Sequence, residues 1–536
     1  MNSSTRTRKK RLPRWLRILI MIFTSGLAAG LIYAWLAYDY YQTPPVPIVD
    51  AYAVLNARND AYSEDEKAWT VYFDIRYNHW WIATETLNDK IYAFQKAEKE
   101  RTYTDIMYEP EDPFTSSHNM FGVPPTHPFY ADVVQITEHL QPQIARAREA
   151  AARPVFGTPI TNNIQESMEF SPDWFAAPPT ADLLDRDPLL DFYMPWVGTS
   201  KAVAAILALD AQVAADSGDT ERAAADIRAM LGMARQAAGD PMLVAQLIAC
   251  SIQSMALERL HEIIARQPPG ADMTPILDLV SVLRARRDKP IAIRIEDEQL
   301  SLLDWLGFYY SDDGSGDGHL TVRGIQTSQD IPHSDTASSI LISLAWPLKD
   351  RFMSKREALD HLQTGIDAFQ SLQTQGPTGL PAFIDAEAAI FAAESTGKQS
   401  LIPLGISTPA WKKALFTEAF AQSWIEATLA LLAIERHRLD TGSYPETLAD
   451  LSPTYLDAIP QDPFDPGQPL KYRLIDNTPH LYSVGSDGDD DRAQRLPEYS
   501  HERASDYELR FADPAGPSPS APDADWVIYP PRPDAQ

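Results

Sequence analysis

The sequence TPAWKKALFTEAFAQSWIEATLALLAIERHRLDTGSYP, residues 408–445, predicts one long helix and the turn that ends it. Thr408 is a good N-cap, and Pro409 suits the first helical position because its missing N–H would be unpaired there anyway. Gly442 ends the helix, since glycine readily takes the positive φ of a helix C-terminus. The apolar residues recur at helical spacing and form one stripe: Phe416, Phe420, Ala427, Leu431 and Ile434.

Short strands are expected after this helix. Residues 470–474 and 481–484 alternate in character as strands do, and residues 523–529 offer a third. The acidic run GSDGDDD, residues 485–491, follows the second strand. We therefore expect residues 408–530 to form a small α+β domain, in which one long helix packs on antiparallel strands.

The order of these motifs resembles the soluble domain of the major pseudopilins of type II secretion. The matching segments are DTGSYP at 440–445, PQDPF at 460–464 and YSVGSDG at 482–488. The resemblance implies a pilin-like head at the C-terminal end of the chain. In that family the helix begins with a cleaved leader and an acidic residue, which residues 18–38 lack, so polymerisation into a pilus is not implied.

The N-terminal region predicts a membrane anchor. Residues 1–17 carry seven basic side chains and no acidic one. Residues 18–37 carry no charge, and a helix of this length can cross a bilayer. The positive-inside rule puts a tail at 1–17 in the cytoplasm, an anchor at 18–38 in the inner membrane and the body outside, in the periplasm. A cleaved signal peptide is the alternative, although the apolar run is longer than usual for one.

Two smaller features accompany the predicted anchor. Gly26 and Gly30 form a G-x-x-x-G pattern, which would let two anchors pack closely in a homodimer, although glycine is common in such helices. Residues 39–50 contain Pro44, Pro45 and Pro47 and predict a stiff linker that lifts the body off the membrane.

Charge excludes some partners for the body. Residues 18–536 contain 39 of the 46 Lys and Arg against all 74 Asp and Glu, a net charge of −35. A body this acidic should not bind nucleic acid or anionic lipid through its net field. The single cysteine, Cys250, lies in an apolar helix and predicts a buried structural thiol.

Residues 51–407 predict an α-helical domain. Helices are expected at 199–216, 220–238 and 242–266, with turns at Ser217-Gly218-Asp219 and Gly239-Asp240-Pro241. Residues 218–224 resemble the turn of tetratricopeptide repeats, but no 34-residue repetition is present, so we expect an array of helical hairpins. An aromatic stripe predicts core packing: Trp69, Tyr72, Phe73, Tyr77 and Trp80. The last residues, 531–536, are expected to be a disordered tail.

Two acidic loops are candidates for calcium, which prefers several oxygen ligands. Asp313, Ser315, Asp317 and Gly318 match the start of an EF-hand loop, but Gly324 stands where its last carboxylate should be. In pseudopilins a calcium ion lies between the loop after the second strand and an acidic segment before the last one. That resemblance implies a calcium site here whose ligands would be Asp487, Asp489, Asp523 and Asp525.

No catalytic motif is present in the sequence: it contains no H-E-x-x-H, G-x-S-x-G, phosphate-binding loop or G-x-G-x-x-G. We therefore expect a membrane-anchored extracytoplasmic scaffold, mainly α-helical, that works by protein–protein interaction. An accessory component of a type II secretion or pilus-like system is the first alternative. An extracytoplasmic hydrolase with an unrecognised site is the second, because sites assembled in space leave no sequence motif.

Overall fold

The structure is a computed structural model that describes most of the chain. The described residues are 13–41, 43–80, 125, 129–161, 170–175, 188–189, 195–240, 242–267, 270–324, 352–375, 385–386, 388–389, 404–462, 465, 467–484, 489–494 and 525–530. The chain forms two compact units. Unit 1 comprises Met1–Val49, Leu302–Gly365 and Ala386–Gly405, and unit 2 comprises Asp50–Ser301, Ile366–Asp385 and Ile406–Gln536.

Unit 1 contains α1 (Arg14–Tyr41), the end of α13 (Ile295–Tyr309) and the start of α16 (Lys355–Gln375). An antiparallel bridge between Tyr310 and Leu320 closes an acidic loop directly after α13. Tyr310 and Leu320 are both buried, so the two ends of this loop are fixed in the core of the unit.

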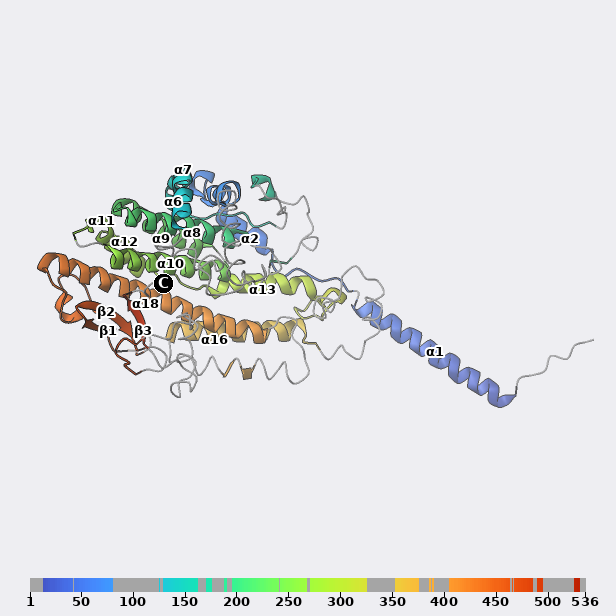
Figure 1. Ribbon diagram of the computed structural model, residues 1–536. Coiled ribbons are helices and arrows are strands. Elements are labelled where there is room, and N and C mark those ends of the chain that lie inside the picture. The colour runs from blue at the N-terminus through green and yellow to red at the C-terminus, as the bar shows by residue number, and fades with distance from the viewer. Residues whose placement is uncertain are drawn as a thin grey trace, which may run out of the picture. The chain divides into compact units, whose positions relative to one another are not determined.

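The centre of unit 2 is formed by three long helices that contact one another, α8 (Pro195–Asp216), α9 (Thr220–Gly239) and α10 (Leu243–Arg266) (Figure 1). Their facing surfaces are rich in alanine, which lets the helix backbones approach closely. The closest approach is between α9 and α7 (Gln141–Ala151), because a Cβ added to Gly232 would lie 2.5 Å from the carbonyl oxygen of Ala151.

Shorter elements surround these helices: α2 (Ala51–Asn59), η1 (Glu64–Glu66), α3 (Trp69–Asp74), the π-helical turn η2 (Ile75–Trp80), α6 (Tyr130–His139), η3 (Pro172–Phe175), α11 (Thr274–Leu277) and α12 (Val280–Asp288). The predicted aromatic stripe lies on α3 and η2, and Tyr72 and Phe73 are fully buried. Trp69 and Phe73 each make an edge-on contact with Phe175. The expectation that these aromatic residues pack in the core is confirmed.

Buried charges join α7 to α8 and α9. Asp210 of α8 is fully buried and accepts hydrogen bonds from Gln141 (2.6 Å), Arg148 (2.7 Å) and Arg222 (2.7 Å). Arg148 also donates to Asp226 of α9 at 2.7 Å. Because an unpaired carboxylate inside a protein is costly, these donors are what permits an aspartate in the middle of so apolar a helix.

The C-terminal part of unit 2 consists of α18 (Leu404–Thr441), η8 (Leu448–Leu451) and a three-stranded antiparallel sheet. The sheet has the order β1 (Lys471–Ile475), β2 (Thr478–Ser483), β3 (Trp526–Tyr529), with Tyr472 opposite Leu481 and a bulge between Leu481 and Tyr482. The sheet lies beside α18, where Phe420 stacks on Trp526 at 4.2 Å (Figure 1). The predicted sheet and the predominance of helix are confirmed.

The boundaries of α18 agree with the sequence at one end only. The helix ends at Thr441 and Gly442 has a φ of +81°, as expected. It begins at Leu404 and not at Thr408, so the predicted N-cap is wrong by one turn. Pro409 therefore lies inside the helix, where its missing N–H leaves the carbonyl of Gly405 without its usual helical donor.

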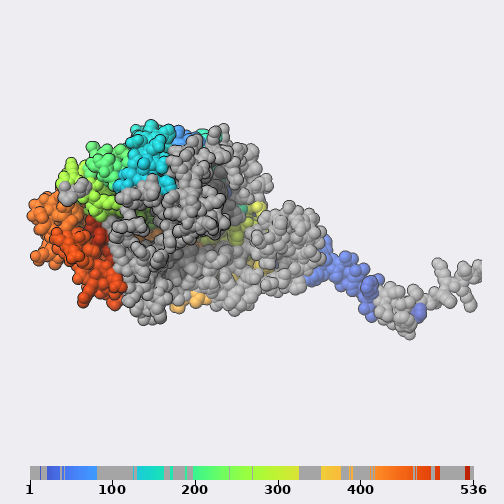
Figure 2. Space-filling model, in the orientation of Figure 1, coloured from blue at the N-terminus to red at the C-terminus, as the bar shows by residue number. Residues whose placement is uncertain are grey.

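α18 and the sheet share a hydrophobic core with α10. His261 of α10 is buried, with Nε2 2.9 Å from Thr428 Oγ1 and Nδ1 3.3 Å from the carbonyl oxygen of Ile528 in β3. Asp457, which follows η8, pairs with Arg284 and Arg287 of α12, and Figure 2 shows the adjoining surfaces of these parts (orange to red beside yellow-green). That residues 51–407 and 408–530 form two separate domains, each able to fold alone, remains a prediction.

We predict that Gly232→Val lowers the free energy of unfolding by about 1–3 kcal/mol, because its side chain would push α9 away from the α7 backbone. Gly239→Ala, at the end of the same helix, is the matched control, since no atom lies within 4 Å of its added Cβ. Denaturant unfolding measures both variants. Equal stabilities for the two would contradict the close α7–α9 contact.

We also predict that His261 makes unit 2 sensitive to acid. Burial lowers the pKa of His261 from 6.5 to about 4, so the unfolded chain takes up a proton at a higher pH than the folded one. The folded state requires the neutral ring. The free energy of unfolding therefore has its full value above pH 6.5 and decreases by about 3 kcal/mol as the pH falls towards 4. His261→Phe should remove this part of the pH dependence, whereas the same change at exposed His139 should not. Parallel stability–pH curves for wild type and His261→Phe would refute the prediction.

Candidate functional site

α1 is the first candidate, because no described part of the chain covers its apolar side chains. Nine large hydrophobic residues from Met21 to Leu36 are 39–73 % exposed: Met21, Ile22, Phe23, Leu27, Leu31, Ile32, Tyr33, Trp35 and Leu36. No heavy atom among its surroundings lies within 4 Å of a Cβ added at Gly26 or Gly30. The face predicted to pair two anchors is thus open, and the homodimer remains a prediction.

By length and composition alone, two other helices could cross a membrane. These are Val197–Asp216 and Leu243–Arg266, and 83 % and 67 % of their most apolar windows are buried. The first carries Asp210 with its three donors, and the second carries His261 and forms the core with α18. Their apolar surfaces are therefore already covered by unit 2, in contrast to the shorter apolar stretch Met21–Leu36 of α1.

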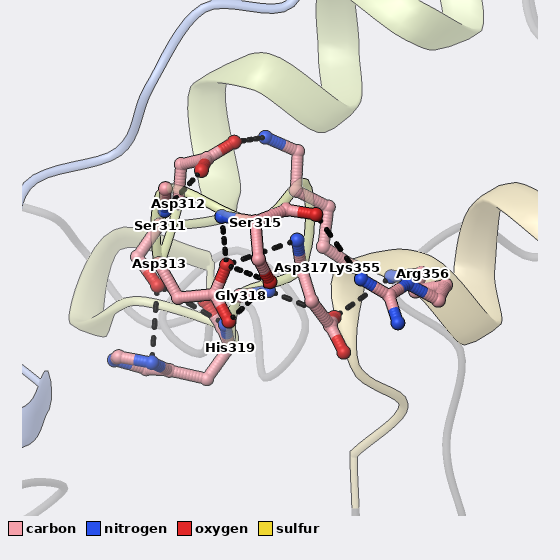
Figure 3. Close-up of polar contacts among 10 residues, drawn as sticks. Ser311, Asp312, Asp313, Ser315, Asp317, Gly318, His319, Lys355 and Arg356 are labelled. Carbon is pink, nitrogen blue, oxygen red and sulfur yellow. Dashed lines mark hydrogen bonds and ion pairs between the residues drawn. The ribbon is translucent and has the colours of Figure 1, made fainter.

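The loop 311–319 of unit 1 is the second candidate, and its carboxylates are all engaged (Figure 3). Asp312 pairs with Lys355 at 2.8 Å, and this bond holds the pKa of Asp312 below its usual value. Asp313 accepts the N–H groups of Ser315 (2.8 Å) and Asp317 (3.2 Å). Asp317 accepts the N–H groups of Gly318 and Arg356. The loop is thus closed by its own hydrogen bonds, without an EF-hand arrangement.

The predicted calcium ligands of the C-terminal region fall into two groups. Asp487 and Asp523 lie outside the described residues. Asp489 is exposed on the turn, whereas Asp525 is fully buried at the start of β3. Asp525 accepts hydrogen bonds from the N–H of Asp491 (3.3 Å) and of Ala493 (2.6 Å). The structure therefore brings Asp525 to the turn but leaves Asp489 on its outer side.

The turn itself has an uncommon backbone. Arg492 and Ala493 both have a positive φ, 62° and 66°, which side chains with a Cβ rarely adopt. The carboxylates of Asp490 and Asp525 hold this conformation, because Asp490 accepts the N–H of Arg492 (2.9 Å) and Asp525 accepts that of Ala493. Asp490 also accepts the Tyr482 hydroxyl of β2 at 3.0 Å. Asp490 is not among the predicted ligands, although it belongs to the same acidic run.

Charge accumulates around Asp525. Burial, with smaller contributions from the neighbouring carboxylates of Asp490 and Asp491, raises the pKa of Asp525 to about 7 despite the lowering effect of the two N–H bonds. Such a set of oxygen ligands suits a hard cation. Within the described ranges, however, no group of three or more His, Cys, Asp or Glu side chains is arranged to hold a metal ion. The calcium site therefore remains a prediction.

Catalytic candidates can be assessed only among the described residues. Cys250 is buried, and burial raises the pKa of its thiol to about 12, so it fits the structural role expected of it and not that of a nucleophile. The buried pair Asp210 and Asp226 is held by Arg148 and, for Asp210, also by Arg222 and Gln141. These carboxylates serve to join helices, and nothing in their geometry presents them to a substrate.

Comparison of the chain with protein-family models, with curated proteins and with solved structures found no match. The pseudopilin resemblance therefore rests on the three motifs quoted from the sequence. Of these, DTGSYP at 440–445 lies entirely in the described part, at the end of α18. The other two lie partly outside it, at Pro463, Phe464 and residues 485–488.

Proposed function

We propose that the protein is a membrane-anchored extracytoplasmic scaffold that works by binding other proteins. The observation that carries this proposal is the exposure of α1. Transferring one large apolar side chain from water is worth about 1.5–3 kcal/mol, and α1 exposes a row of them that no described part of the chain covers. A bilayer supplies the missing apolar surroundings. The basic residues before α1 then favour a cytoplasmic N-terminus and a periplasmic body.

The scaffold role follows from the rest of the chain. The helices of unit 2 bury apolar faces in a shared hydrophobic core, and the acidic composition favours solubility of the body. The order of α18, the turn at Gly442 and the three strands supports a pilin-like head, and contiguous helices α8 to α10 support helical-hairpin packing. Because the head is what the pseudopilin resemblance implies, an accessory role in type II secretion or a pilus-like system is the second candidate.

The membrane proposal predicts where the two ends of the chain lie. A reporter that is active only in the cytoplasm should work when fused before Met1 and be silent when fused after Gln536. Leu27→Arg with Leu31→Arg should reduce the membrane-bound fraction, because each charge costs about 3 kcal/mol near the centre of a spanning helix. Leu27→Ile with Leu31→Ile is the control. Reporter activity at the C-terminus, or full membrane recovery of the double arginine variant, would contradict the proposal.

We further propose that the turn 489–494 and Asp525 bind calcium, with Asp487, Asp489 and Asp523 as the other ligands that the resemblance implies. A cation beside Asp525 would offset the repulsion among Asp490, Asp491 and Asp525, which burial strengthens. Each oxygen of Asp525 makes one hydrogen bond to an N–H group and keeps a second lone pair for a cation. Calcium bound only by the folded chain would stabilise it in proportion to the logarithm of its concentration over Kd.

The test is thermal unfolding of the full-length protein in detergent, with excess chelator and then with millimolar calcium. Calcium should raise the Tm of the wild type and of Asp476→Asn, an exposed aspartate in the neighbouring β1–β2 turn. It should not raise the Tm of Asp525→Asn. If calcium leaves the wild-type Tm unchanged, or shifts wild type and Asp525→Asn equally, this site is wrong.

A further inference from the structure

The C-terminal end of α1 contacts the loop that follows α13, which also belongs to unit 1. The rings of Tyr40 and His319 are stacked, with centroids 3.7 Å apart and an interplanar angle of 18°. His319 Nε2 lies 2.7 Å from the carbonyl oxygen of Tyr40, one of the last carbonyls of α1, which also accepts the hydroxyl of Thr43 at 2.9 Å and its N–H at 3.4 Å. Since a carbonyl only accepts, Nε2 carries the proton and donates it. His319 therefore caps the end of the anchor helix.

The proline-containing segment that follows is also bound. The N–H of Val46 donates to the carbonyl oxygen of Tyr310 at 3.0 Å. Pro47 and Ile48 pass directly over Gly307 of α13, where an added Cβ would lie 2.6 Å from Ile48 N and 2.9 Å from Pro47 Cα. Only glycine permits this close approach of two backbones. The segment predicted to be a spacer is thus packed along the end of α13.

The loop that carries His319 is itself rigidly supported. Ser311 Oγ lies 3.0 Å from His319 Nδ1 and accepts the backbone N–H of His319 at 3.0 Å, which fixes the ring (Figure 3). Lys355 and Arg356, at the start of α16, hold the loop through Asp312 and Asp317. Lys355 is buried, whereas the side chain of Asp312 is 25 % exposed, so only the lysine end of this pair is sheltered from water. The position of the His319 ring is consequently set by two helices of unit 1.

We propose that loop 311–319 and Gly307 form a collar that locks α1 to the part of unit 1 at Leu302–Gly365, so that the helix and this part move as one body. Three independent contacts carry this inference: the stacked ring pair, the bond between Val46 and Tyr310, and the backbone approach at Gly307. This inference rests on the proposed membrane anchoring and deepens it. A collar of this kind holds this part of unit 1 in one orientation at the membrane surface, as a scaffold that presents a binding face to membrane partners requires.

Distance measurements by electron spin resonance test the collar directly. Spin labels go on Leu36→Cys of α1 and Asp360→Cys of α16, both exposed, in a Cys250→Ala background. The protein is reconstituted in lipid nanodiscs and also measured in detergent. If the collar contacts are present, the distribution of the distance between the two spin labels should be a single narrow peak. His319→Ala removes both the ring contact and the donor, and should replace that peak by a broad distribution.

Further variants separate the contributions. His319→Phe keeps an aromatic ring without the donor, and His319→Gln keeps a donor without the ring, so both should give intermediate widths. Gly307→Val should also broaden the distance distribution, because its side chain would push Pro47 and Ile48 away from α13. Gly198→Val, in an open position on α8 of unit 2, is its matched control and should leave the peak narrow. If Gly307→Val does not fold, as its circular dichroism would show, the His319 series still decides.

The outcomes distinguish this inference from the proposed function. A broad wild-type distribution, or one that His319→Ala leaves unchanged, overturns the collar even if the protein is found in membranes. A protein that does not fractionate with membranes overturns the anchoring, whereas a narrow peak in detergent that is lost in His319→Ala would still support the collar.

Discussion

The burial of α10 is the constraint on which unit 2 depends. This helix contacts α8 and α9 and forms one core with α18 and β3, so almost none of its faces is free for polar side chains. Each buried polar group on it must therefore find a partner within the protein. Gln253 donates to the carbonyl of Ala421 in α18, and Arg259 donates to Gln212 of α8. These bonds fix which helices can lie against α10 and in which register.

His261 shows how strictly this requirement acts. Its two ring nitrogens face Thr428 and the carbonyl of Ile528, and only a neutral ring fits the surrounding apolar core. The Thr428 hydroxyl donates its one proton to the carbonyl oxygen of Trp424 at 2.7 Å, so its oxygen accepts Nε2–H of His261 at 2.9 Å. A single side chain thereby joins α10, α18 and the last strand. The C-terminal helix and sheet, folded without α10, would lack the His261 ring that lies beside the carbonyl of Ile528.

Local signals were sufficient for much of the fold. The apolar stripe, Gly442 and the alternation of residues 470–484 each act within a few residues, and the end of α18 and the strands were predicted from them. The start of α18 was not, because Thr408-Pro409 has the composition of a helix N-terminus while preceding residues can also be helical. Contacts between distant residues, such as Tyr40 with His319 or Val46 with Tyr310, leave no local pattern, so the proline segment was expected to stand free.

The candidate site shows the same division between local and distant causes. The acidic run after β2 was visible in the sequence, but the choice of Asp489 over Asp490 depends on which way each side chain points. That direction is set by the positive φ of Arg492 and Ala493, which in turn depends on N–H bonds to Asp490 and to Asp525, more than thirty positions further along the chain. The pseudopilin resemblance, from which the predicted ligands came, does not indicate how a turn held by a distant residue orients its side chains.

The three most apolar helices, α1, α8 and α10, differ less in composition than in what surrounds them. On α8, Asp210 is tolerated because Arg148, Arg222 and Gln141 converge on it, and a bilayer offers no such donors. On α10, Gln253, Arg259 and His261 make hydrogen bonds to side chains and carbonyls of unit 2. The described part of α1 carries no buried polar side chain that needs a protein partner, and it leaves its apolar residues uncovered. By length and hydropathy α8 and α10 qualify as spanning helices, but their buried polar partners show that both belong to a protein core, whereas no described residue covers the apolar stretch Met21–Leu36 of α1.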